Sequence, residues 1–267
     1  VSIDYLGELS KTKDDCLDAF IQYCDIIDYY TSTPWKQDHL ELSIKPSQLG
    51  LRFDKAYCYD LMSKLAHKAN VFCMNIRLDM EDKSLIQDTI DLCLHLHKKN
   101  KNVGLAIQTN MFRTKNDIVN LMSKNISLRL VKGAYKEDII SAYQKQEQIK
   151  KLFIQNAFTI LSDRCRTYYY MKDTNKVIPA IGTHDEEIID EITKNMGAFN
   201  ITKEDCDFEF LYGIRRDLSQ RMKDEGYQVR LYVPFGTEWL PYTLRRLKEY
   251  KNLMFVVTNM IKEWRGK

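Results

Sequence analysis

Short apolar runs alternate along the chain with longer stretches in which apolar residues recur at helical spacing. In the first of these stretches, Cys16, Ala19, Phe20, Tyr23 and Ile27 follow the i, i+3, i+4 and i+7 pattern of an amphipathic helix. The short runs have the length and composition of strands. We expect strands at residues 1–7, 40–45, 71–79, 103–109, 127–133, 177–183, 208–213 and 228–235.

Helical patterns also follow every later strand, near residues 54–69, 83–99, 115–124, 138–171, 185–196, 215–225 and 238–251. This alternation predicts parallel strands joined by crossover helices, and eight such units close most economically into an α/β (βα)8 TIM-type barrel. An open doubly wound sheet is the alternative, but no Gly-x-Gly-x-x-Gly turn follows any strand. Because no Pro/Gly-rich linker or internal repeat interrupts the pattern, we expect a single domain over residues 1–267.

The segment after the fifth strand departs from this rhythm. Residues 136–171 are too long for one crossover helix, and "QKQEQIKK" within them is polar apart from Ile149. We therefore expect a distorted barrel with an extra helical segment or lid after the fifth strand, followed by the barrel helix.

Composition and charge narrow the functional classes. Hydrophobic residues make up 44% of the chain and charged residues 29%, which is typical of a soluble globular protein. The 40 basic and 37 acidic residues are too balanced to indicate a nucleic-acid partner. No apolar run approaches the roughly 18 residues that span a bilayer, and no signal peptide is recognisable. The chain begins with a strand-like "VSIDYLGE" and no Met, so we expect a trimmed N-terminus.

The cysteines indicate a reducing compartment. Their number, 7, is odd and no Cys-x-x-Cys spacing occurs, which argues against a disulfide framework and against a zinc site. The sequence thus predicts a cytoplasmic protein without a metal centre.

Charged and polar residues gather where the predicted strands end. In a barrel of this class the active site lies at the C-terminal ends of the strands, and buried charges there need partners. The strand ends supply Glu8, Lys45, Asp79, Gln108, Arg129, Lys132, Thr183, His184, Leu211 and Tyr232.

The last predicted helix carries a second, polar stripe. Tyr242, Arg245, Arg246 and Glu249 fall at i, i+3, i+4 and i+7. Alone, this pattern is typical of a solvated helix face with one Arg–Glu pair. However, Leu240, Leu244 and Leu247 already form a separate packing stripe, so the polar stripe is additional to the packing face.

The stretches "RLVKGAY" (129–135) and "YTLRRLKE" (242–249) resemble the flavin-dependent proline dehydrogenase family, whose Tyr-x-x-Arg-Arg-x-x-Glu signature the second one fits at every fixed position. The resemblance extends over essentially the whole chain, and its length suits the stand-alone bacterial form. Further matches, in order, are "DYLGE" (4–8), "SIK" (43–45), "RLD" (77–79), "LAIQ" (105–108), "GTHD" (182–185), "LYG" (211–213) and "LYVPFG" (231–236).

This resemblance implies an FAD enzyme that oxidises L-proline to Δ1-pyrroline-5-carboxylate, by hydride transfer from C5 to flavin N5, as the first step of proline catabolism. The electrons would pass to a quinone. A quinone acceptor raises the option of peripheral contact with the inner face of the cell membrane, although no convincing amphipathic anchor is present.

The resemblance also implies roles for individual residues. Lys45, Arg245 and Arg246 would hold the substrate carboxylate, because guanidinium and ammonium groups form charge-assisted hydrogen bonds with it. Glu8 would pair with Arg245 and close the pocket, while Glu249 and Asp79 would balance the remaining cations. The positive charge would also lower the pKa of the substrate amine. The ring pocket would consist of Tyr135, Leu211, Tyr232 and Tyr242, with Tyr232 filling the space of a 4-hydroxyl group.

The implied flavin site lies on the central strands. Arg129 would reach flavin N5, Gln108 the pyrimidine edge, and Gly133 would allow close backbone approach. Thr183 and Glu186 match a capping box, and the helix that follows would offer its N-terminus to the pyrophosphate. The complete implied set is Gln108, Arg129, Lys132, Gly133, Ala134, Thr183 and His184. Gly182, Asp185 and Lys136 depart from the usual family pattern.

Two other functions compete with this interpretation. A lyase could use Lys45 or Lys132 as a Schiff-base nucleophile, which requires a lysine of lowered pKa. The neighbouring carboxylates instead favour a charged lysine. A non-catalytic barrel that binds a partner through its polar stripe is the third hypothesis.

Overall fold

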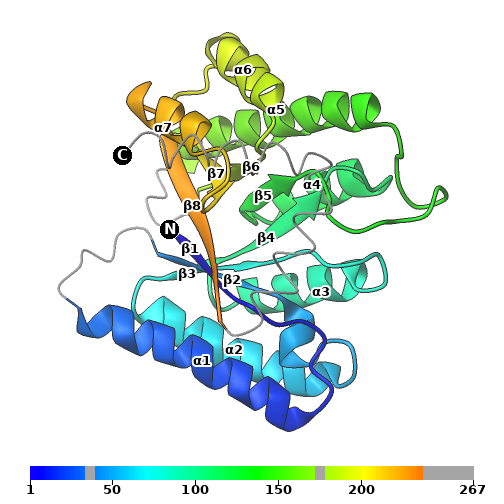
Figure 1. Ribbon diagram of the computed structural model, residues 1–267, viewed down its shortest axis with the longest axis vertical. Coiled ribbons are helices and arrows are strands. Elements are labelled where there is room, and N and C mark those ends of the chain that lie inside the picture. The colour runs from blue at the N-terminus through cyan, green and yellow to red at the C-terminus, as the bar shows by residue number, and fades with distance from the viewer. Residues whose placement is uncertain (34–39, 172–177, 237–267) are drawn as a thin grey trace, which may run out of the picture.

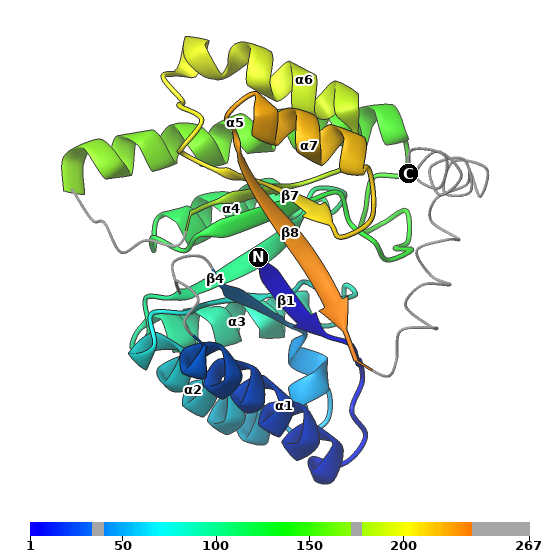
Figure 2. The ribbon, with the colours of Figure 1, turned by 60° about the vertical axis from the view of Figure 1, so that its left-hand side comes forward.

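Eight parallel strands close into a barrel in the computed structural model, which describes residues 1–33, 40–171 and 178–236, without the side chains of 163–171. Each strand pairs with the next in sequence, and β8 pairs with β1 to close the ring (Figure 2). The TIM-type barrel prediction is therefore confirmed. The strands are β1 (Ser2–Tyr5), β2 (Glu41–Ile44), β3 (Asn75–Leu78), β4 (Val103–Gln108), β5 (Leu128–Val131), β6 (Ala180–Gly182), β7 (Asp207–Leu211) and β8 (Gln228–Phe235).

Helices surround the strands, with α1 and α2 on one side and α5, α6 and α7 on the opposite side (Figure 1). Their bounds are α1 (Lys13–Ser32), α2 (Lys55–Val71), α3 (Ile86–His97), α4 (Thr114–Met122), α5 (Gln146–Met171), α6 (Glu186–Asn195) and α7 (Arg216–Asp224). Two 3-10 helices, η1 (Pro46–Leu49) and η2 (Met196–Phe199), follow β2 and α6. The predicted helix 238–251 lies outside the described residues, so the single-domain prediction over 1–267 stays a prediction.

Local sequence signals explain several element boundaries. Thr12 caps α1 with a complete capping box, because its side chain accepts from the amide of Asp15 while Asp15 accepts in return. The predicted strand 71–79 is shortened, since α2 continues to Val71 and the chain turns through Cys73, whose φ is 56°. None of the helices in the described part of the chain is long and apolar enough to cross a membrane.

The extra helical segment predicted after β5 is not helical. Residues 132–145 form turns that dock on the β4–α4 loop: the amide of Tyr143 donates to Asn110 at 2.8 Å and that of Phe112 to Ser141 at 3.1 Å. These bonds replace the i to i−4 bonds of a helix. The polar "QKQEQIKK" is instead the start of α5, and Ile149 begins the buried stripe that continues with Phe153 and Ala157.

The barrel interior is polar, whereas the layer between strands and helices is apolar. Residues such as Ile44, Leu78 and Leu130 point outward into that apolar layer and are fully buried. The parallel register places Ser2 beside Glu41, and it places Ser43 between Asp4 of β1 and Arg77 of β3. Arg77 is accommodated because its neighbour on β4 is Gly104, where a Cβ would lie 3.3 Å from the Arg77 guanidinium.

A buried ion pair lies within this interior. Arg77 and Glu41 side chains are both 0% exposed, and the Arg77 Nη2–Glu41 Oε2 distance is 2.9 Å. Glu41 also accepts from Ser2, while Arg77 donates to the carbonyl of Ile178. The pKa of Glu41 is lowered to about 2, because Arg77 and other arginines outweigh the opposing effect of burial.

We expect Arg77→Met to lower the free energy of unfolding by about 3–5 kcal/mol, because it leaves the Glu41 carboxylate buried and unpaired. The double variant Arg77→Met, Glu41→Leu should recover much of this loss. Urea denaturation measures both. As a control, Lys64→Met removes the exposed Lys64–Asp60 pair and should cost no more than about 0.5 kcal/mol. Equal losses in all three variants would contradict the proposed importance of the buried pair.

Candidate active site

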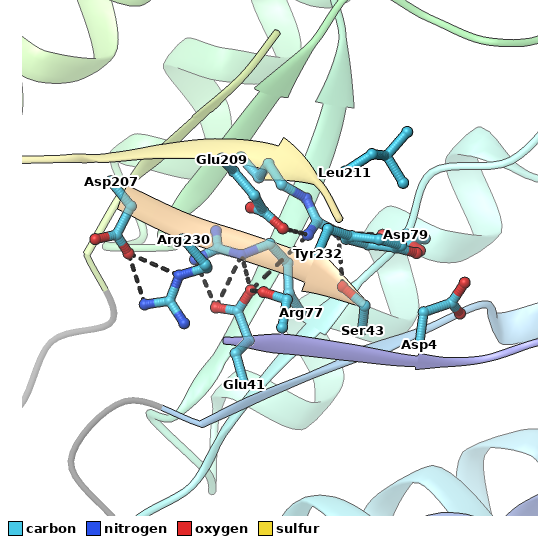
Figure 3. Close-up of polar contacts among 12 residues, drawn as sticks. Asp4, Glu41, Ser43, Arg77, Asp79, Asp207, Glu209, Leu211, Arg230 and Tyr232 are labelled. Carbon is cyan, nitrogen blue, oxygen red and sulfur yellow. Dashed lines mark hydrogen bonds and ion pairs between the residues drawn. The ribbon is translucent and has the colours of Figure 1, made fainter. Parts of the chain in front are cut away.

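The C-terminal ends of the strands bring together residues that are distant in sequence. Asp79 from the end of β3 contacts Arg129 from β5 and Tyr232 from β8, and it lies 3.8 Å from Lys45 at the end of β2. Figure 3 shows Asp79, Tyr232, Asp4 and Leu211 toward the arrowheads of the strands, to the right of the Glu41–Arg77 pair. This end of the barrel is the candidate active site.

Arg129 is the centre of this cluster. Its guanidinium donates to Glu209 at 2.7 Å, to the hydroxyl of Ser43 at 2.9 Å, and to Asp79. Burial alone would lower the pKa of Arg129, but Glu209, Asp79 and Glu41 outweigh it and raise the pKa. These contacts use three of the five guanidinium N–H groups, so Arg129 is a fixed cation that retains donor capacity.

Lys45 is neutralised by a carboxylate that the sequence analysis did not single out. Its Nζ lies 2.7 Å from both carboxylate oxygens of Asp4, which is fully buried, and 3.8 Å from Asp79. Burial lowers the pKa of Lys45, yet Asp4 and Asp79 more than compensate and raise it. A lysine that stays protonated is a poor amine nucleophile, so the geometry disfavours the Schiff-base lyase.

Tyr232 contacts both Asp79 and Arg129 of this cluster. Its hydroxyl donates to Asp79 Oδ2 at 2.8 Å, and its ring lies over the Arg129 guanidinium, 5.2 Å from the ring centroid to Cζ. Contact of a cation with an aromatic face is attractive and fixes the ring plane. Tyr232 is therefore held at both its ring and its hydroxyl, and it remains only half-buried.

A second ion pair lies deeper in the barrel interior than this cluster. Arg230 of β8 donates to Asp207 of β7, with a Nε–Oδ2 distance of 2.7 Å. Among the described residues, the interior then contains four cationic side chains, Lys45, Arg77, Arg129 and Arg230, against five acidic ones, Asp4, Glu41, Asp79, Asp207 and Glu209. Every one of these cations has a carboxylate partner within hydrogen-bond distance.

The end of β4 and the β5–α5 loop form a cradle of polar atoms. Gln108 donates through its amide to the carbonyls of Met80 at 3.2 Å and Glu81 at 2.9 Å, while its Oε1 is buried without a partner among the described residues. Gly133 has a φ of 109°, and a Cβ there would lie 2.2 Å from Asn110 Oδ1, so only glycine fits. Asn110 Oδ1 and Thr109 Oγ1 are likewise buried acceptors without a described partner.

The N-terminus of α6 differs from its predicted form. Asp185, not Thr183, is the N-cap and accepts from the amide of Ile188, while Thr183 accepts from the amide of Asp185. The predicted Thr183–Glu186 capping box is therefore wrong. Lys132 pairs with Asp185 at 2.7 Å, which neutralises the carboxylate that departs from the family pattern. His184 accepts the amide proton of Leu211 through Nε2 at 2.9 Å, so its ring proton lies on Nδ1.

The remaining predicted residues divide into two groups. Glu8 and Tyr135 are half-buried at the strand ends and Ala134 is exposed. Burial lowers the pKa of Lys45, and Glu8 helps to raise it, after the larger contributions of Asp4 and Asp79. Tyr242, Arg245, Arg246 and Glu249 lie outside the described residues, and their site roles stay predictions.

Three buried residues of the cluster were missed at the sequence level: Asp4, Ser43 and Glu209. All three lie inside strands rather than at their ends. The signal that could have identified them is polar alternation, because Ser2 and Asp4, and Asp207 and Glu209, occupy every second position of their strands. Such a pattern predicts a polar barrel interior, which reading the strand ends alone does not reveal.

A separate groove of about 570 Å³ lies at the other end of the barrel. It is bordered by Lys98 and Lys101, which precede β4, and by Lys124, which precedes β5. Its wall contains the paired rings of Tyr59 and His95, with centroids 5.0 Å apart. Because it opens at the N-terminal ends of the strands, the groove is separate from the candidate active site.

Comparisons with known proteins agree with this geometry. The family model described as proline dehydrogenase matches residues 1–257. Proline dehydrogenase 2 of Bacillus subtilis (strain 168) is 29% identical over 271 residues, covering 98% of this chain and 82% of that protein. Proline dehydrogenase of Deinococcus radiodurans is 33% identical over 202 residues, covering 74% of this chain and 61% of that protein.

A solved structure shows the same fold. The chain is similar to proline utilization A (PutA) from Bdellovibrio bacteriovorus inactivated by N-propargylglycine, with a TM-score of 0.80 and 20% identity. The match covers 94% of this chain and 30% of the PutA chain, so this chain spans under a third of that larger protein.

The buried carboxyl of Glu81, two residues after Asp79, gives a pH prediction. Burial raises its pKa to about 7, although hydrogen bonds from Ser47 oppose the shift. The folded state then binds more protons than the unfolded state between about pH 4.5 and 7, so this group's contribution to stability is lost as the pH rises through that window. We expect the free energy of unfolding of Glu81→Gln, relative to that of the wild type, to increase by about 3 kcal/mol as the pH rises from 4.5 to 8.

Urea denaturation at a series of pH values measures this difference. The matched control is Asp82→Asn, because the pKa of Asp82 is lowered overall: its hydrogen bonds and Arg52 outweigh burial. Its difference from wild type should stay constant above pH 5. A constant difference for Glu81→Gln as well would contradict a raised Glu81 pKa.

Proposed function

The chain belongs to the proline dehydrogenase family, and from this premise we propose that it oxidises L-proline to Δ1-pyrroline-5-carboxylate with bound FAD and passes the electrons to a quinone. The observation that carries this proposal is the Lys45–Asp79–Arg129–Tyr232 cluster. A lysine that could bind a carboxylate, a fixed guanidinium and an aromatic ring lie together at the end of the barrel where active sites of this fold lie, which supports the proposal.

The polar cradle fits a flavin. Gln108 Oε1 is a buried acceptor without a described partner, which suits the N–H of a pyrimidine edge, and Gly133 permits backbone approach. Arg129 would present a remaining N–H to the flavin ring, and Lys132, whose charge Asp185 already balances, would offer a further hydrogen-bond donor. When bound, the flavin would supply N5 as the acceptor of the hydride from proline C5.

On the substrate side, Lys45 would donate to the proline carboxylate. Asp4 holds Nζ at two points, which leaves the third ammonium proton to be directed at a ligand. Since each of the four described interior cations already has a carboxylate partner, the excess positive charge of this hypothesis would come from Arg245 and Arg246. Our hypothesis that cations favour the neutral substrate amine therefore depends on those two residues.

The wider setting follows from the same proposal. Electrons that leave the flavin need an acceptor, and a quinone in the membrane implies peripheral contact of a cytoplasmic protein with the inner face of the cell membrane. No described surface identifies where that contact would be.

We expect the purified holoenzyme to be yellow and to lose its visible flavin absorbance when L-proline is added anaerobically. Lys45→Met should lower kcat/KM roughly 10- to 100-fold, the loss of a charged hydrogen bond. Because that variant leaves Asp4 unpaired, the double variant Asp4→Asn, Lys45→Met is its folding control and should fold without recovering activity.

A colourless protein, or a yellow one that L-proline does not bleach, would contradict the proposed function. Cyclopentanecarboxylate, which has the carboxylate but no amine, should bind without bleaching. Borohydride trapping of a carbonyl substrate on Lys45 would favour the lyase instead.

We also expect a preference for proline over 4-hydroxyproline that depends on Tyr232. Tyr232→Ser opens space near C4 of the ring, so the ratio of kcat/KM for 4-hydroxyproline to that for proline should rise roughly 10-fold. Tyr232→Phe is the matched control, since it keeps the ring over Arg129 and removes the hydroxyl that bonds to Asp79. No relative gain in the serine variant would show that Tyr232 does not set this preference.

A further inference from the structure

The β1–α1 loop, which carries Glu8, has a strained backbone. Leu9 has a φ of 59°, in the left-handed region that a leucine rarely adopts, and its side chain is 45% exposed. Apolar burial therefore does not hold this turn in place. Its conformation must depend on polar contacts of the backbone.

Those contacts are made by η1, directly after Lys45. The amide of Leu9 donates to Ser47 Oγ at 3.1 Å, and the hydroxyl of Ser10 donates to the carbonyl of Gln48 at 2.7 Å. A Cβ at Gly7 would lie 2.6 Å from Gln48 Nε2, so the loop packs closely on this helix. The position of Glu8 is thus set by η1.

Ser47 is in turn held by Glu81. The Ser47 amide donates to Glu81 Oε1 at 2.9 Å, and the Ser47 hydroxyl donates to Glu81 Oε2. Ser47 is fully buried and Glu81 is 2% exposed, so water does not substitute for either partner. The carbonyl of Glu81 also accepts from Gln108, which connects this pair to the flavin cradle.

We propose that Ser47 and Glu81 are positioning residues: the relay Leu9 N–H to Ser47 Oγ–H to Glu81 carboxylate holds the strained turn that sets Glu8 beside the Lys45 end of the barrel. The inference deepens the proposed function, in which Glu8 closes the substrate pocket, and it rests on that function. Neither residue touches the substrate in this scheme; each acts through Glu8.

The relay needs the carboxylate form of Glu81, because of how the hydroxyl proton of Ser47 is shared. Ser47 has one hydroxyl proton, and Oγ already accepts from Leu9, so that proton must go to an acceptor. A protonated Glu81 would donate to Oγ instead and leave the Ser47 proton without its acceptor. The pKa of Glu81 is raised to about 7 chiefly by burial, with Glu8 raising it further, while the Ser47 hydrogen bonds and Lys45 lower it. Among the described residues, Cys58 on α2 also interacts with Glu81, and the pKa of its thiol is raised chiefly by burial.

The test uses the holoenzyme and two independent readouts. The first is hydrogen exchange in peptides that cover residues 6–12. Ser47→Ala and Glu81→Gln should each lower the protection of the Leu9 amide roughly 10-fold, as expected for one lost hydrogen bond. In the wild type this protection should fall as the pH decreases through about 7, and in Glu81→Gln it should be low at every pH.

The second readout is steady-state kinetics with L-proline. Ser47→Ala should raise KM roughly 10-fold with kcat within about twofold of wild type, because it loosens a residue that retains the substrate. Glu8→Gln should have the same effect, and the double variant Ser47→Ala, Glu8→Gln should not exceed it. Ser84→Ala is the control: Ser84 bonds to Asp82 in the same loop as Glu81 but lies outside the relay.

The outcomes separate the two proposals. If L-proline reduces the flavin but Ser47→Ala keeps wild-type exchange, the relay is overturned while the proposed function stands. If exchange accelerates but KM is unchanged, or if the two single effects add, the positioning role is overturned. If L-proline does not reduce the wild-type flavin, the proposed function and the role of Glu8 fail together, and exchange alone decides whether the relay exists.

Discussion

Charge pairing inside the barrel is the constraint on which the rest of the structure depends. A TIM-type interior is ordinarily filled by branched apolar side chains, whereas this one holds arginines, a lysine and carboxylates from β1, β2, β3, β5, β7 and β8. An unpaired charge there would cost several kcal/mol. The register of the strands therefore depends on which carboxylate lies opposite which cation. Arg129 of β5, for example, bonds to residues of β2 and β7 and to the end of β3.

The same pairing makes the candidate site rigid. Tyr232 and Lys45 could each adopt several rotamers in isolation, but Asp79 and Asp4 hold their polar ends. A site that binds a small carboxylate gains from this, because side chains that are already fixed lose little conformational entropy when the ligand arrives. The same two carboxylates thus contribute to the stability of the barrel and to the binding of a ligand, so a substitution at either aspartate would affect both.

The architecture was predictable from the sequence to a greater extent than the site. Alternating strands and helices place all eight strands of the barrel in order, since that pattern is a local property of the chain. Asp4 and Glu209 were missed because a charged residue in the middle of a buried strand is unfavourable without a partner, and that partner becomes apparent only in the closed ring. The cap at Asp185 was missed for a related reason: Thr183 and Glu186 have the correct spacing, but Lys132, 53 residues away, makes the aspartate favourable.

The polar interior also has a consequence for how the chain folds. Glu41 and Arg77 can pair within the first half of the ring, but Asp79 finds Arg129 and Tyr232 only at separations of 50 and 153 residues. In an incomplete ring such carboxylates would face water rather than their partners, so partial closure stabilises the apolar layer between strands and helices but not the charged interior. The apolar layer can form as each helix packs on its strands, whereas the charges of the interior are fully paired only in the closed ring, so the last strands to join complete both the barrel and its charge pairing.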